Sequence, residues 1–192
     1  MSVGLKISFD EYTEMVADGA FKALRDRRVE LIRGELCEMN PPGPDHSEAV
    51  TRLNEWSTEP SARKLVRIRI QEPIGIPELE SAPQPDVAWV KVREYRDRHP
   101  LPPEVLLLIE VADSSLDSDC GEKAELYAAA GIQDYWVVSL RERLIHVYRK
   151  PRGGAYSQHC TAGFGEELRP LAFPQYSLSV AELLGSWLPC GS

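Results

Sequence analysis

The chain has 192 residues, of which 43% are hydrophobic and 27% are charged, and its net charge is −8. A chain of this length can bury roughly 70% of its unfolded surface, so we expect one domain over residues 1–192 that needs no disulfide bonds to fold. The acidic balance argues against a protein that coats nucleic acid non-specifically, although a local basic groove is compatible with it.

The first part of the chain predicts a short helix and a β-hairpin. The stretch SFDEYTEMVADG begins with a capping box, Ser8-x-x-Glu11, and ends near Gly19. The following stretch, VELIRGELCEM, alternates in polarity and contains the turn signal Arg33-Gly34. We therefore expect a capped helix that leads into a hairpin.

The middle of the chain predicts a second helix and three strands. Apolar residues recur at helical spacing from His46 to Glu59, and Pro60 is expected to end this helix. The stretches RKLVRIRIQEPIGI and PDVAWVKV have the pattern of strands. VLLLIEVAD is a nearly continuous apolar run, which is typical of a strand buried on both faces.

The last part predicts a helix from Asp119 to Ala130, capped by Asp119 with Glu122 and stopped by Gly131. DYWVVSLRERLIHVYRK predicts two strands that turn near Arg141-Glu142, and a short helix is expected from about Val180 to Trp187. The order of elements indicates a mixed α/β or α+β domain with a central sheet and helices on its faces.

Four cysteines lie far apart, and none forms a C-x-x-C pair. This spacing argues against a structural zinc site and against a disulfide framework. The sequence begins without an apolar leader, and no apolar run approaches the roughly 18 residues of a membrane span. We therefore expect a cytoplasmic protein with no membrane partner.

Two carboxylates stand where buried strands are expected, Asp86 in PQPDVAWV and Glu110 in LLLIEVAD. An unpaired buried carboxylate costs several kcal/mol or takes up a proton. Side chains alternate between the two faces of a strand. One face of the first strand therefore carries Asp86, Ala88 and Val90, and one face of the second carries Leu106, Leu108, Glu110 and Ala112. The sheet could thus present the two acids side by side. Asp86 could instead begin its strand at a solvated edge, and Glu110 could pair with an arginine. A divalent cation such as Mg²⁺ or Mn²⁺ would relieve the repulsion between them.

Lys123 lies on the helical face that is expected to pack on the sheet, together with Leu126, Tyr127 and Ala130. A lysine in this position could simply keep its head group in water while its stem is buried. Its occurrence together with two acids in buried strands favours a site over three unrelated coincidences.

Pro85-Asp86 and Glu110-Val111-Ala112 resemble the motif of the PD-(D/E)xK nuclease superfamily, which has the restriction endonuclease-like fold. The chain is more closely similar to a widespread bacterial family of endonucleases within that superfamily. The stretches that carry this resemblance are VELIRGELCEMNPPGPDH, VRIRIQEPIGI, PQPDVAWV, LLLIEVADSSLDSDCGEKAELYAAAGIQDYWVV and LIHVYRKP. The superfamily places its lysine at the position of Ala112, whereas in the closer family the lysine lies on the next helix, where Lys123 matches.

The resemblance implies a restriction endonuclease-like core over about residues 28–150, preceded by an N-terminal helix and hairpin. It implies Mg²⁺- or Mn²⁺-dependent hydrolysis of phosphodiester bonds, in DNA rather than RNA, with Asp86, Glu110 and the backbone carbonyl of Val111 as metal ligands. Lys123 would orient the attacking water or stabilise the transition state. A role as a base would require its pKa to fall far below about 10.4.

Four further residues are candidates for accessory roles. Gln71 could hold a water or a phosphate oxygen, or it could face solvent. Glu30 and His46 match acidic and histidine positions of the closer family; without that match, they would be an exposed hairpin residue and a helix cap. Tyr127 could bond at the site or could be a core aromatic residue.

Two other functions are compatible with the sequence. The chain could be a non-catalytic module of the same fold that binds nucleic acid or protein, as its acidic charge and Ala112 suggest. It could also hydrolyse a smaller phosphate ester. A homodimer is expected from the general habit of soluble proteins and of nucleases that cut both strands.

Overall fold

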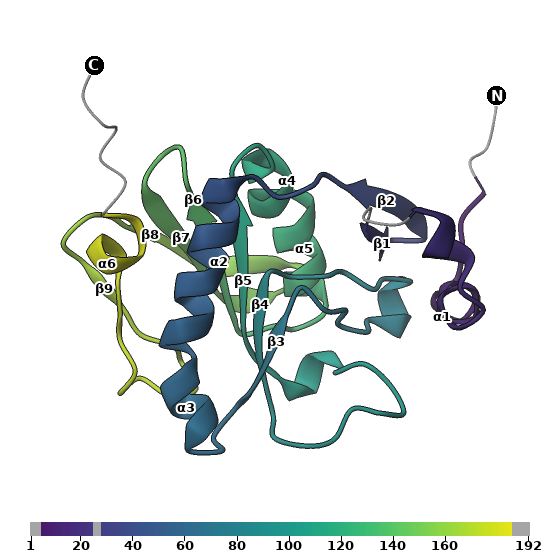
Figure 1. The fold of residues 1–192 in the computed structure, drawn as a ribbon, viewed down its shortest axis with the longest axis horizontal. Coiled ribbons are helices and arrows are strands. Elements are labelled where there is room, and N and C mark those ends of the chain that lie inside the picture. Colours follow the sequence, from purple (N-terminus) through teal and green to yellow (C-terminus); the bar gives the residue numbers. More distant parts are fainter. Residues whose placement is uncertain (1–4, 25–27, 186–192) are drawn as a thin grey trace.

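The computed structural model describes residues 5–24 and 28–185. Its centre is a six-stranded sheet in the order β3-β4-β5-β6-β7-β8 (Figure 1). The strands of this sheet are β3 (Arg67–Ile70), β4 (Val87–Val90), β5 (Val105–Ala112), β6 (Asp134–Ser139), β7 (Leu144–Arg152) and β8 (Ala155–Ala162). The β5–β6 pair is parallel and the other neighbours are antiparallel, so the sheet is mixed. The predicted fold class, a central mixed sheet flanked by helices, is confirmed.

The N-terminal region has the predicted helix and hairpin. Ser8 Oγ accepts a hydrogen bond from the backbone N–H of Glu11, and the Glu11 carboxylate accepts one from the N–H of Ser8, so the capping box is formed. Arg33 and Gly34 both have positive φ angles, 50° and 83°, as a tight hairpin turn requires. The elements are α1 (Phe9–Ala17), the 3₁₀ helix η1 (Ala20–Leu24), β1 (Arg28–Ile32) and β2 (Glu35–Met39).

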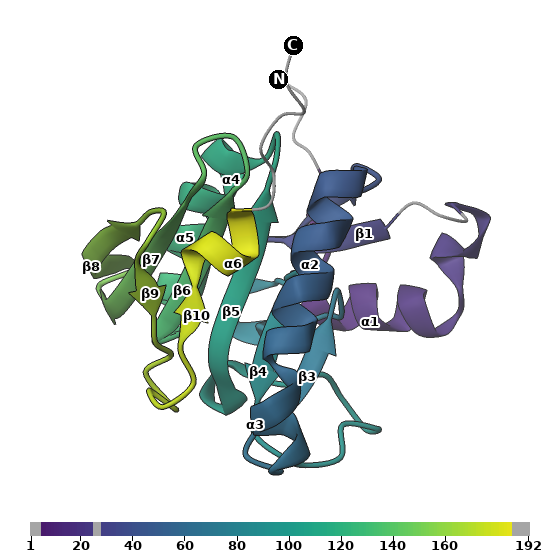
Figure 2. The same ribbon diagram turned by 60° about the vertical axis from the view of Figure 1, so that its left-hand side comes forward.

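Helices cover both faces of the sheet (Figures 1 and 2). One face carries α2 (Pro44–Trp56), α3 (Thr58–Ala62) and α6 (Val180–Leu184). The other face carries α4 (Leu116–Cys120) and α5 (Glu122–Ala129). Shorter elements complete the described chain: η2 (Pro77–Leu79), η3 (Pro102–Glu104), β9 (Glu167–Leu168) and β10 (Leu178–Ser179). No helix of the described residues is long and apolar enough to cross a membrane.

The two faces have different cores. On the α2 side, Trp56 stacks on Trp89 and Trp136, with ring centroids 4.7 and 6.0 Å apart. On the α5 side, Tyr127 packs edge-on against Tyr135 beside aliphatic side chains of β4 and β5. The N-terminal hairpin joins this second core through Ile32 and Cys37, so β1 lies close to α5.

Two predicted helix boundaries are wrong. The second helix ends at Trp56, and Pro60 lies inside the next short helix, α3, because a proline in the first turn replaces an N–H that has no intrahelical partner. The helix predicted from Asp119 to Ala130 is broken at Gly121, whose φ and ψ of −104° and −98° are not helical. The stop is as predicted, because Gly131 has a φ of 80°.

One predicted strand face is also wrong. The β4–β5 ladder shifts register between Trp89 and Val90, and Leu106 packs with the core on the α2 side instead of with Leu108. The bulge therefore breaks strict alternation at this point. The face predicted for Lys123, Leu126 and Tyr127 does pack on the sheet, since all three are buried. The predicted end of the last helix at Trp187 lies outside the described residues.

Candidate active site

The two acids meet at one end of the central sheet. Asp86 immediately precedes β4, and Glu110 lies near the end of β5, which runs antiparallel to β4 and pairs Val87 with Ile109. The side chains are buried, with Asp86 4% and Glu110 2% exposed. The backbone N–H of Asp86 donates to Oε2 of Glu110 over 3.3 Å, so the two positions are in direct contact.

Asp86 is surrounded by hydrogen-bond donors. Oδ1 accepts from the side-chain amide of Gln71 over 3.0 Å, and Oδ2 accepts from the backbone N–H of Val111 over 2.8 Å. Nε2 of His46, in the first turn of α2, lies 3.1 Å from the same Oδ2. Burial alone would raise the pKa of Asp86, but the contacts with His46, Val111 and Gln71 outweigh it and hold the pKa below its usual value. Asp86 is therefore ionised at neutral pH.

The side chain of Glu110 contacts helix α5. Its Oε1 lies 3.2 Å from Nζ of Lys123 and accepts a hydrogen bond of 2.9 Å from the hydroxyl of Tyr127. Burial raises the pKa of Glu110 to about 8, and the Lys123 charge offsets only part of that rise. The two carboxylates therefore differ in their affinity for a proton although they belong to residues in direct contact.

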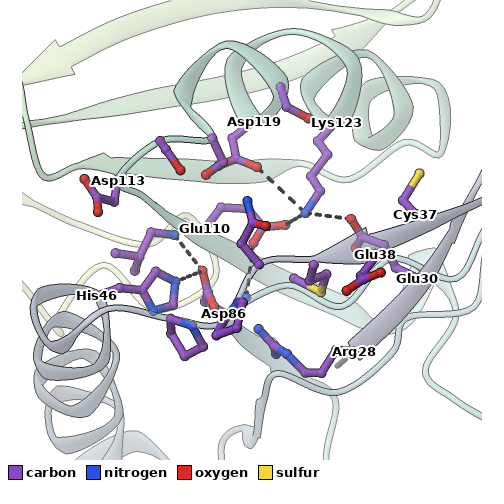
Figure 3. A pocket seen from close by; sticks show the side chains of 18 of the residues that line it. Arg28, Glu30, Cys37, Glu38, His46, Asp86, Glu110, Asp113, Asp119 and Lys123 are labelled. Carbon is purple, nitrogen blue, oxygen red and sulfur yellow. Dashed lines mark hydrogen bonds and ion pairs between the residues drawn. The ribbon is translucent and has the colours of Figure 1, made fainter. Parts of the chain in front are cut away.

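Lys123 lies at the point where three carboxylates converge (Figure 3). Its Nζ is 3.2 Å from Glu110, 3.3 Å from Glu30 and 3.8 Å from Asp119. Burial alone would lower the pKa of Lys123, but the three carboxylates outweigh it and raise the pKa above its ordinary value. The ammonium group is therefore charged at any physiological pH and is not a proton acceptor.

Two of these carboxylates are themselves held in place. Oε2 of Glu30 accepts from the backbone N–H of Gln84 over 3.1 Å. Oδ2 of Asp119 accepts from the hydroxyl of Ser115 over 2.6 Å, and burial raises the pKa of Asp119. Asp119 was predicted only as a helix cap. Its spacing of four residues before Lys123 was the signal in the sequence that could have assigned it to the site.

The acids open onto a pocket of about 280 Å³. It is lined by residues from the β1–β2 hairpin, the start of α2, the ends of β4 and β5, and the α4–α5 segment. Seven acidic residues contribute to this lining: Glu30, Glu38, Asp86, Glu110, Asp113, Asp119 and Glu122. Gln71 and Tyr127 do not line the pocket. Gln71 donates a hydrogen bond to Asp86, and Tyr127 donates one to Glu110.

The two carboxylates have lone pairs available to bind a cation. Each carboxylate oxygen has two lone pairs. Among the described residues, Oδ1 of Asp86 meets the Gln71 amide, and Oε2 of Glu110 meets the N–H of Asp86, so each of these oxygens keeps one lone pair. Two carboxylate oxygens supplemented by waters suit Mg²⁺ or Mn²⁺. The described residues contain no group of three His, Cys, Asp or Glu side chains arranged as metal ligands. Lys123 lies where Glu30, Glu110 and Asp119 converge.

The structure brings the predicted site residues into one network: Asp86, Glu110, Lys123, Gln71, Glu30, His46 and Tyr127. Val111 reaches this network through its N–H, while a role for its carbonyl in metal binding stays a prediction. The catalytic and metal-binding roles of the other residues stay predictions as well.

A mixed sheet with two buried acids at the ends of neighbouring strands, and a lysine on a helix later in the chain, defines the restriction endonuclease-like class. The chain belongs to the Uma2 family, whose model, described as "Putative restriction endonuclease", matches residues 9–181. The fold is also similar to that of a crystal structure described as a "putative nuclease" from Anabaena variabilis, with a TM-score of 0.72 at 16% sequence identity. That match covers 95% of this chain and 99% of the other, and at this identity it concerns the fold. No curated protein matches the sequence.

Proposed function

We propose that the protein is an endonuclease that hydrolyses phosphodiester bonds with the help of Mg²⁺ or Mn²⁺, and that DNA is its substrate. The observation that carries this proposal is the contact between Asp86 and Glu110 at the end of the central sheet, with Lys123 bound to the second acid. Membership of a family described as "Putative restriction endonuclease" supports it.

Asp86 Oδ1 and Glu110 Oε2 would hold the divalent cation, since these oxygens keep a lone pair. A bound cation supplies positive charge that polarises the phosphate and stabilises the leaving oxygen. In the hydrolysis, the oxygen of a water molecule bonds to phosphorus as the bond to the leaving ester oxygen breaks. The water loses a proton to solvent, and the leaving oxygen takes one up.

Lys123 acts in this proposal as a fixed positive charge. Because its pKa is raised by Glu110, Glu30 and Asp119, it keeps its proton throughout the reaction. It orients Glu110 and offsets the negative charge that develops on the phosphate. His46 and Gln71 fix the orientation of the Asp86 carboxylate, as outer-sphere partners of metal ligands do.

The test is nicking of supercoiled plasmid with Mg²⁺ or Mn²⁺ by the wild type and by three variants of similar shape: Asp86→Asn, Glu110→Gln and Lys123→Met. Each variant should lose at least about 10²-fold in rate, which is the low end of what a positioned catalytic group contributes. Glu125→Gln, an exposed acid on the same helix as Lys123, is the matched control and should nick like the wild type. A wild type inert with both metals, or variants that all nick at the wild-type rate, would refute the proposal.

Substrate class and assembly need separate measurements. Cleavage of DNA, but not of a single-stranded RNA or of bis-p-nitrophenyl phosphate, would support a deoxyribonuclease over the other hydrolases. We expect a homodimer, which light scattering would detect as a mass of about twice 21.5 kDa. A cytoplasmic location stays a prediction.

A further inference from the structure

Arg28 faces the candidate active site from the N-terminal hairpin. It is the first residue of β1, and side chains two residues apart lie on the same face of a strand. Arg28, Glu30 and Ile32 accordingly all line the pocket. Since Glu30 binds Lys123, the face that carries Arg28 is directed at the acids.

The guanidinium group of Arg28 has a donor without an acceptor. Its Nη1 is buried, yet no hydrogen-bond partner for it exists among the described residues. Buried donors in folded proteins nearly always have a partner, and an arginine has five N–H groups in a planar fork. This N–H group therefore needs a hydrogen-bond acceptor, and the described part of the chain does not supply one.

The charge of the pocket indicates what that acceptor is. Seven carboxylates line the pocket, and its two permanently charged cations are Lys123 and Arg28. Lys123 is occupied by Glu30, Glu110 and Asp119, whereas Arg28 has an unpaired donor. Figure 3 shows the two cations on opposite sides of the acidic side chains. An anion that enters an acidic pocket needs a cationic donor of this kind.

We propose that Arg28 is a phosphate-binding residue of this site, and that its Nη1 donates to a non-bridging oxygen of a nucleic-acid phosphate. The proposal rests on the proposed nuclease function, because it takes the substrate to be a phosphodiester. An arginine suits this role since its fork of donors matches the geometry of a phosphate and keeps its charge when partly buried. The positive charge of Arg28 would thus attract the phosphate, which the surrounding carboxylates repel.

The experiment separates binding from cleavage. A fluorescein-labelled duplex oligonucleotide is titrated with wild type, Arg28→Gln and Arg28→Lys, by fluorescence anisotropy with Ca²⁺ at several salt concentrations. Arg28→Gln should weaken binding about 10- to 100-fold, the range of a charge-assisted hydrogen bond. It should also reduce the slope of log affinity against log salt by about 1, because one phosphate contact is lost. Arg28→Lys, which keeps the charge, should restore the slope.

The matched control is Arg63→Gln, which removes the same charge from an exposed arginine at the end of α3, away from the acids. It should leave both affinity and salt slope within about twofold of the wild type. A residue that acted only on the stability of the hairpin would change the melting temperature without changing the salt slope.

Two outcomes would overturn the assignment, and they are distinguishable. If the wild type binds DNA and Arg28→Gln binds it equally well with the same slope, the role of Arg28 is wrong while the nuclease proposal stands. If the wild type does not bind DNA at all, both proposals are wrong.

Discussion

Glu104 and Glu110 both contact cations, and their pKa values move in opposite directions. Glu104 accepts from both terminal nitrogens of Arg98, over 2.7 and 2.9 Å, and these bonds lower its pKa to about 2. Glu110 contacts Lys123 over 3.2 Å, yet its pKa rises to about 8 because it is buried. Proximity to a cation therefore does not fix the charge state of an acid; the loss of water around it can outweigh the cation.

The surroundings of the two ion pairs explain this difference. Arg98 is partly exposed, so Glu104 keeps access to water while it gains two charged donors. Lys123 and its three acidic partners are all less than 10% exposed, so three acidic groups share one lysine out of contact with water. In this cluster the loss of water dominates, and the pKa values of Glu110 and Asp119 rise despite the lysine.

Lys123→Met would break the buried cluster and should have the largest effect. It leaves Glu30, Glu110 and Asp119 without a counter-charge, which for a buried pair costs about 3–5 kcal/mol of stability. Urea unfolding with EDTA measures this loss. The variant should lose more at pH 8 than at pH 5.5, because a carboxyl with a raised pKa in the folded state binds a proton at low pH and costs stability as the pH rises.

Two controls accompany this measurement. Lys91→Met removes an exposed lysine and should leave stability nearly unchanged. The double variant Lys123→Met/Glu110→Gln should recover part of the loss, since it removes one uncompensated carboxylate. A loss below about 1 kcal/mol in Lys123→Met would mean that the carboxylates reach water and that the cluster is not truly buried.

Gly121→Ala would disturb the geometry of the same cluster and should have an intermediate effect. A Cβ on Gly121 would lie 2.6 Å from the backbone oxygen of Asp117, so α4 would have to shift, and Asp119 with it. We expect a loss of about 1–3 kcal/mol together with a fall in nicking activity.

Gly131→Ala is the matched control for this variant. Its added Cβ meets nothing within 4 Å, but its φ of +80° is unfavourable for alanine, so it should cost about 1–2 kcal/mol of stability. The nicking rate of folded protein should not change. Equal activity in Gly121→Ala and Gly131→Ala would show that the α4–α5 break does not position the site.

Glu104→Gln would break the partly exposed ion pair with Arg98 and should have the smallest effect. Because the pKa of Glu104 is lowered from its ordinary 4.5 to about 2, its ionic contribution is fully present above pH 4.5 and is lost as the pH falls toward 2. Unfolding midpoints should differ slightly between wild type and variant at pH 7, less than for Gly131→Ala, and should converge near pH 2. A difference that persists at pH 2 would indicate a packing role for Glu104.

The sequence predicted helices, turns and strands well where a single local feature determined them. The capping box at Ser8, the turn at Arg33-Gly34 and the apolar run of β5 are all confirmed. The errors occurred where two signals overlapped. Pro60 reads as a helix stop but is tolerated in the first turn of a new helix, and Gly121 breaks a segment whose pattern continues through it.

The sequence predicted those site residues that are polar where the pattern of their strand or helix predicts an apolar residue. Asp86, Glu110 and Lys123 are polar at positions that should be apolar, and the structure buries all three together. Asp119 and Arg28 violate no local pattern, because an acid at a helix start and an arginine at a strand start are ordinary. The position of Arg28 depends on how the hairpin packs against the end of the sheet, which no local spacing encodes, whereas the spacing of Asp119 to Lys123 was a signal in the sequence.

The residues around the two acids belong to elements that differ in the free energy needed to open them locally. Asp86 and Glu110 are carried by paired central strands of the six-stranded sheet, whereas Arg28 belongs to a separate two-stranded sheet and His46 to the first turn of a helix. Central strands exchange their amide hydrogens last, while peripheral hairpins and helix ends open at lower free energy. Partial opening would therefore remove the outer residues of the pocket while leaving the two acids adjacent. Such an opening would change the wall of the pocket without taking apart the centre of the sheet.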